Sequence, residues 1–138
     1  MLYTEIISGL WIGDIDIMYN KKFIIDNQIK TIINCTMDHA FSNTIDTTQN
    51  IRLPLANNLY NSLDILRQNK SKILEFIKNK LDDGHVLICC LDGIIMSPFV
   101  ASLYLIQYGE IPKSEVRKII QSKNEAVSME FDLNLLDL

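Results

Sequence analysis

Cys90 stands where a fully apolar segment, 86–89, meets a short loop, 91–96, that contains Gly93 and leads into an apolar helix. A strand, a tight loop and a helix in this order direct backbone N–H groups and the positive end of a helix dipole into one concavity. A thiolate at its base is stabilised by the same field. These residues predict an anion cradle with Cys90 as its nucleophile. A plain strand-to-helix turn with buried cysteines explains them equally well.

The rest of the chain supplies elements that could hold such a loop. Apolar, β-branched runs predict one or two strands within 2–13 and further strands over 31–35, 51–55 and 86–89, with a polar loop over 36–50. Helical spacing and capping residues predict a short helix after Asp14 and further helices over 62–81, from Ser97 to Gly109, over 113–122 and over 130–138. Ser97 is expected to cap its helix, with Pro98 in the first turn. Strands that alternate with helices predict an α/β domain.

Composition limits the classes of function. The chain has 138 residues, of which 48% are hydrophobic, and is expected to form a single domain over 1–138. A net charge of −4 gives no support to nucleic-acid or anionic-membrane binding, and the apolar runs are too short for a membrane helix. Three cysteines, two of them adjacent, favour an intracellular, reducing location. The wealth of Ile, Asn and Lys is typical of an AT-rich genome, such as that of a large DNA virus or a protozoan.

The stretch 89–97, Cys-Cys-Leu-Asp-Gly-Ile-Ile-Met-Ser, resembles the signature His-Cys-x-x-Gly-x-x-Arg-Ser/Thr of the dual-specificity branch of the protein tyrosine phosphatases. Cys90, Gly93 and Ser97 match it. Weaker likenesses follow in the family's order at 9–13, 32–36, 53–55 and 116–136. The resemblance implies a cysteine-based phosphatase fold, with a central mixed sheet of about four or five strands flanked by helices. It also implies that Ser97 hydrogen-bonds the sulfur of Cys90.

Several positions depart from the family pattern. The signature arginine, which grips two phosphate oxygens through its planar fork, is replaced by Met96, which has no donor. Alignment on 53–55 places Asn57 at the general-acid position, and an amide cannot give up a proton at neutral pH. Cys89 replaces the histidine before the nucleophile, and Asp92 adds a negative charge at the rim of the cradle. The five residues expected to form the phosphate loop are Leu91, Asp92, Gly93, Ile94 and Ile95.

Three functional hypotheses follow. The first is a catalytically impaired pseudophosphatase that binds a protein partner, either a phosphoprotein or an active phosphatase. The second is a weakly active protein tyrosine or dual-specificity phosphatase that uses Cys90 as nucleophile. The third is an interaction module whose cleft is closed, which predicts that Asp92 or Met96 packs into the cradle. None of the three requires a cofactor, and no set of His, Cys and carboxylate residues has the spacing of a zinc site.

Overall fold

The computed structural model describes residues 1–129 and 131–136. The strands are β1 (Tyr3–Ile7), β2 (Leu10–Gly13), β3 (Ile29–Asn34), β4 (Gln49–Arg52) and β5 (His85–Cys89). The helices are α1 (Ile15–Met18), α2 (Lys21–Asp26), α3 (Leu59–Leu81), α4 (Met96–Gln107) and α5 (Lys113–Lys123). The sheet has the order β1-β2-β5-β3-β4, in which β1 is antiparallel to β2 and every other pair is parallel. The predicted α/β fold with a mixed sheet flanked by helices is therefore confirmed.

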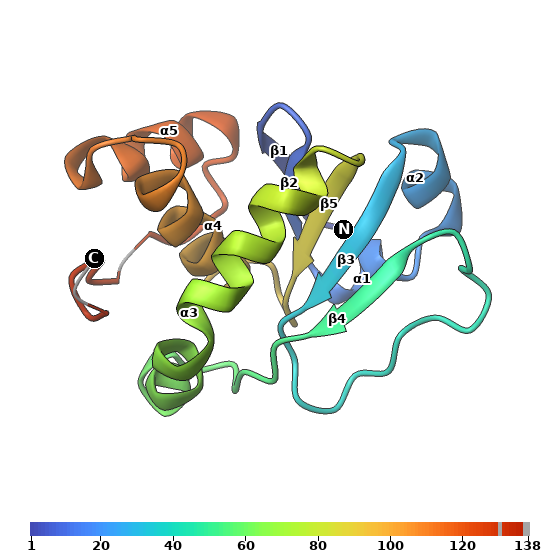
Figure 1. The fold of residues 1–138 in the computed structure, drawn as a ribbon, viewed down its shortest axis with the longest axis horizontal. Coiled ribbons are helices and arrows are strands. Elements are labelled where there is room, and N and C mark those ends of the chain that lie inside the picture. Colours follow the sequence, from blue (N-terminus) through green and yellow to red (C-terminus); the bar gives the residue numbers. More distant parts are fainter. Residues whose placement is uncertain (130, 137–138) are drawn as a thin grey trace.

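Helices cover both faces of this sheet, and β5 lies at its centre. Helices α3, α4 and α5 pack on one face, where α3 crosses the sheet in Figure 1, and α1 and α2 pack on the other. Successive side chains of a strand point to opposite faces. Val86 and Ile88 accordingly join the larger core under α3 and α4, while Leu87 and Cys89 join the smaller core under α1 and α2. Burial on both faces explains why 86–89 is apolar without alternation.

Several predicted boundaries in the first two thirds of the chain differ from the observed ones. The strand predicted over 31–35 is β3, which spans Ile29–Asn34. The strand predicted over 51–55 is β4, which begins earlier, at Gln49, and ends before Pro54. Proline has no N–H to donate to the ladder, whereas Gln49–Arg52 pairs with β3 in register. The helix predicted over 62–81 begins at Leu59, because the side chain of Asn58 caps it by accepting from the Asn61 N–H. Helix α2 was not predicted.

The C-terminal helix predicted over 130–138 is absent from the residues that the structure describes. Residues 131–136 form turns, and positions 130, 137 and 138 lie outside the described residues. By contrast, the short helix predicted after Asp14 is present as α1, with the Asp14 carboxylate accepting from the Ile17 N–H at 3.0 Å. No helix within the described ranges is long and apolar enough to cross a membrane.

Candidate active site

Cys90 follows the last residue of β5 directly, so the centre of the sheet fixes its position. Its backbone N–H donates to the Gly13 carbonyl of β2 at 3.1 Å. On the other side, the Cys35 N–H at the end of β3 donates to the Cys89 carbonyl at 2.7 Å. The carboxyl ends of parallel strands are where α/β sheets place their sites. Residues 90–96, here called the Cys90 loop, begin at such a point and lead into α4.

The sulfur of Cys90 is completely buried and is contacted from two sides. The Gly93 N–H donates to Cys90 Sγ at 3.2 Å, and Ser97 Oγ lies 3.3 Å from the same sulfur. Ser97 Oγ also donates to the Gly13 carbonyl, at 3.4 Å. The contact that the family resemblance implies between Ser97 and the sulfur is therefore present. The Gly93 N–H is the donor to the sulfur, whereas Ser97 Oγ accepts from the Cys90 thiol.

Ser97 is not the helix cap that the sequence predicts. Helix α4 begins one residue earlier, at Met96, and its N-cap position, Ile95, makes no side-chain hydrogen bond. Ser97 instead lies within the first turn, with its side chain directed at the sulfur of Cys90. A serine at this position is compatible both with a helix cap and with a contact to the sulfur. The sequence therefore could not distinguish the two roles.

Gly93 is required by the shape of the loop. Its backbone angle φ is +71°, a conformation that residues other than glycine rarely adopt. A Cβ atom there would lie 2.9 Å from the Asp14 backbone nitrogen and 2.9 Å from Leu2 Cδ2. The Cys90 loop thus packs directly against the turn that follows β2.

Asp92 turns its carboxylate back into the loop. Its Oδ1 accepts a hydrogen bond from the Ile94 N–H at 2.9 Å and lies 3.8 Å from Cys90 Sγ. Its Oδ2 accepts from Asn57 Nδ2 at 3.3 Å. We call this last contact the Asn57–Asp92 bridge. The structure thereby brings together two residues that the sequence singled out separately, the general-acid position and the rim carboxylate, which lie 35 positions apart.

Met96 is fully buried in the larger core at the first position of α4. Its neighbour Ile95 is partly exposed and lines a surface hollow that also contains Asn57. Leu91, with 42% of its surface exposed, lines a second hollow on the other side of Asn57. The position that holds a cation in the family therefore contributes only apolar packing here.

Cys89 and Cys35 are buried thiols beside the loop. Burial in apolar surroundings, reinforced by neighbouring thiols, raises the pKa of each well above its ordinary value. Cys89 Sγ donates to the Ile33 carbonyl at 3.4 Å and belongs to the smaller core, on the opposite face from Cys90. All three cysteines are free. Cys89 and Cys35 act as small apolar core residues.

The three arginines of the chain lie outside the Cys90 loop. Arg52 donates to the carbonyls of Thr36 and His39, at 2.9 and 2.7 Å, and stacks on Phe41. Arg67, on α3, pairs with Asp64 at 3.7 Å. No sequence pattern predicts the Arg52 contacts, because its closest partner atoms are backbone carbonyls.

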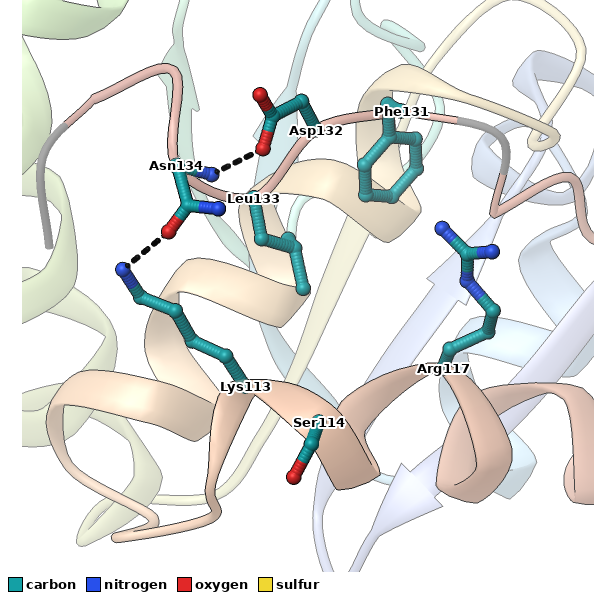
Figure 2. A pocket seen from close by; sticks show the side chains of 7 residues that line it. All are labelled: Lys113, Ser114, Arg117, Phe131, Asp132, Leu133 and Asn134. Carbon is teal, nitrogen blue, oxygen red and sulfur yellow. Dashed lines mark hydrogen bonds between the residues drawn. The ribbon is translucent and has the colours of Figure 1, made fainter.

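Arg117 lies on α5, in the hollow drawn in Figure 2. There Lys113 Nζ donates to Asn134 Oδ1 at 2.9 Å, and Phe131 and Leu133 supply apolar walls. None of the residues that line this hollow belongs to the Cys90 loop. Over the described ranges, no group of three or more His, Cys, Asp and Glu side chains is arranged to hold a metal ion.

Comparison with known proteins agrees with this geometry. No family model matches the chain. Dual specificity protein phosphatase 8 of Mus musculus is 24% identical over 130 residues, which cover 94% of this chain and 19% of that protein. The chain thus spans about a fifth of the length of the curated relatives it matches.

Solved structures show the same fold at lower identity. Human DUSP28 superposes with a TM-score of 0.82 at 11% identity, over 93% of this chain and 84% of that one. Human tyrosine phosphatase-like serine/threonine/tyrosine-interacting protein gives a TM-score of 0.80 at 18% identity, over 97% and 90%. The resemblance that the loop motif indicates is therefore confirmed, and the chain is similar to the dual-specificity phosphatases in sequence and shares their fold.

Proposed function

We propose that this protein is a catalytically impaired pseudophosphatase of the dual-specificity type, which acts by binding a protein partner. The observation that carries the proposal is the absence of a cation at the loop. Met96 is buried and has no donor, and within the described residues no Lys or Arg side chain forms a hydrogen bond or ion pair with residues 90–96. Losing one oxyanion donor costs on the order of 10²–10³ in rate, and losing a full cation should cost at least as much.

The general-acid position supports the same proposal. Asn57 cannot protonate a leaving oxygen, and its amide is engaged with Asp92. A phosphoryl group transferred to the thiolate would therefore leave behind an alkoxide or phenolate without a proton. The partner is proposed to be a phosphoprotein or an active phosphatase. The three free cysteines favour an intracellular place of action.

One observation favours the alternative of a weakly active phosphatase. Cys90 Sγ accepts a hydrogen bond from the Gly93 N–H, a contact of the kind that stabilises a thiolate, and Ser97 Oγ lies 3.3 Å away. A nucleophile can persist when the groups that assist its reaction have been replaced. Such an enzyme would work slowly and would prefer substrates whose leaving group needs no proton, such as a nitrophenolate.

Hydrolysis of p-nitrophenyl phosphate tests the proposal. The purified protein is compared with an active dual-specificity phosphatase and with its own Cys90→Ser variant. We expect turnover at least about 10²-fold below the active enzyme and no difference between the wild type and Cys90→Ser. Turnover that rivals the active enzyme and disappears in Cys90→Ser would establish the phosphatase instead.

A further inference from the structure

The carboxylate of Asp92 lies where it competes with any anion for the Cys90 loop. Its Oδ1 takes the Ile94 N–H at 2.9 Å and lies 3.8 Å from Cys90 Sγ. Backbone N–H groups that converge at a helix N-terminus attract negative charge. Here one of them is already used by a negative group from the loop itself.

The Asn57–Asp92 bridge fixes the other oxygen of this carboxylate from outside the loop. Asn57 belongs to the segment between β4 and α3, so the contact joins two segments that are distant in sequence. Both oxygens of Asp92 are therefore held, one by each segment. A carboxylate with both oxygens bonded is less free to swing aside than a lone surface aspartate.

The charge of Asp92 is left without a basic partner. Within the described part of the chain, no Lys, Arg or His side chain forms an ion pair with it. Like charges that lie close together repel, and the repulsion is stronger near a protein surface than in bulk water. A phosphate approaching Cys90 would meet this repulsion with no cation to offset it.

We infer that Asp92 is an internal ligand of the Cys90 loop, which excludes phosphate and other oxyanions. Asn57 acts as its positioning residue through the bridge. The partner is then recognised through an unphosphorylated surface, and a phosphoryl group on it does not enter the loop. The inference rests on the proposed function and narrows it, because it selects an unphosphorylated partner over a phosphoprotein.

Titration with inorganic phosphate tests this inference. The probe is followed through the backbone amide resonances of ¹⁵N-labelled protein, with Ile94 and Gly93 as reporters. We expect Asp92→Ala to bind phosphate with a dissociation constant at least about tenfold lower than that of the wild type, because like-charge repulsion is removed and the Ile94 N–H is released. Asp92→Asn keeps the shape of the side chain without its charge and should fall between the two.

Asp38→Asn is the matched control. Asp38 lines the hollow beside Asn57, but its side chain is 89% exposed and its carboxylate lies 3.2 Å from His39 Nδ1, which is not a residue of the loop. This variant removes the same charge from the same side of the molecule and should leave phosphate binding unchanged. Thermal unfolding is used to establish that each variant folds. If Asp92→Ala does not fold, Asp92→Asn replaces it as the test variant.

Two results would overturn the inference. One is a wild type whose Ile94 amide responds to phosphate as strongly as that of the Asp92 variants. The other is the failure of wild type, Asp92→Ala and Asp92→Asn alike to bind phosphate, which would mean that no anion site lies behind the carboxylate. Neither result implies that the protein is an active phosphatase. A wild type that binds phosphate but does not turn over p-nitrophenyl phosphate refutes the inference and leaves the proposed function intact, whereas turnover that depends on Cys90 refutes the proposed function.

Discussion

The residues in and around the Cys90 loop form two sets that differ in what holds them. The matched positions, Cys90, Gly93 and Ser97, agree with the phosphatase signature and contact one another around the buried sulfur. The changed positions are Met96, which stands at the signature arginine, Asn57, which the alignment on 53–55 places at the general acid, and Asp92, which adds a charge at the rim. Of these, Met96 packs into the core, while Asn57 and Asp92 bond to each other at the surface.

This difference has a physical cause. Gly93 and Ser97 support the turn from β5 into α4 as well as the sulfur, so their loss would disturb the fold. By the family resemblance, Met96 and Asn57 stand at positions that serve the reaction, and the sheet and helices form with these residues in place. The backbone shape of such a loop therefore does not by itself establish its chemistry.

The largest effect on stability is expected at a matched position. Gly93→Val should lower the free energy of unfolding by about 3 kcal/mol, because φ at this residue is positive and a side chain would collide with the backbone of Asp14. Urea unfolding followed by circular dichroism measures the loss. Leu91→Ala, two residues away and 42% exposed, is the control and should stay within about 0.5 kcal/mol of the wild type. Equal effects of the two variants would mean that the matched position Gly93 is no more important for stability than an ordinary exposed residue of the loop.

Rebuilding the changed positions should restore chemistry only when they are changed together. Met96→Arg alone is expected to give little activity, because Asn57 still lacks a proton to donate and the Asp92 carboxylate still faces the phosphate. Met96→Arg with Asn57→Asp should do better. Adding Asp92→Ala should raise turnover of p-nitrophenyl phosphate by about 10²-fold over Met96→Arg alone.

Two controls accompany this series. Cys90→Ser in the triple variant should abolish the gain. Because Met96 is buried, thermal unfolding must show that each arginine variant folds. Equal, negligible activity of all the folded variants would mean that the assignment of Asn57 and Met96 to the family's positions is wrong.

The pH dependence of stability should distinguish the buried core thiols from the matched residues, beginning with Cys89, the residue before Cys90. Burial raises the pKa of Cys89 and of Cys35, so both thiols stay neutral when folded at pH values where the unfolded chain ionises them. Their contribution is complete below the unfolded pKa of about 8.5. Above it, the free energy of unfolding should fall by about 1.4 kcal/mol per pH unit for each thiol until the folded pKa is reached.

Urea unfolding between pH 8 and 10 measures this slope. Cys89→Ala should reduce the slope of the free energy of unfolding against pH by the contribution of one thiol. Ser114→Ala, at an exposed position of α5, should leave the slope unchanged. A Cys89→Ala slope that equals that of the wild type would mean that the thiol ionises alike in both states.

Much of this protein was determined by its sequence alone. The apolar run 86–89, Gly93 and the apolar helix after it are local signals, and they located β5, the Cys90 loop and α4. The identities of Asn57 and Met96 predict which functional groups are missing, because chemistry depends on residue type. The boundaries of helices and strands were predicted less accurately. Asn58, for example, is a residue type common in turns, but in the fold it caps α3.

Only the tertiary structure decided how the changed positions are arranged. The Asn57–Asp92 bridge joins residues 35 positions apart, and no local pattern encodes such a contact. The Asp92 contact with the Ile94 N–H is local, two residues apart, but only the packing of the loop brings the other carboxylate oxygen to Asn57. Ser97 faces the sulfur because β2, β5 and α4 meet at Gly13 and Cys90. The packing of the sheet and helices sets which of these residues lie close together. That proximity supports the inference that the Cys90 loop excludes oxyanions.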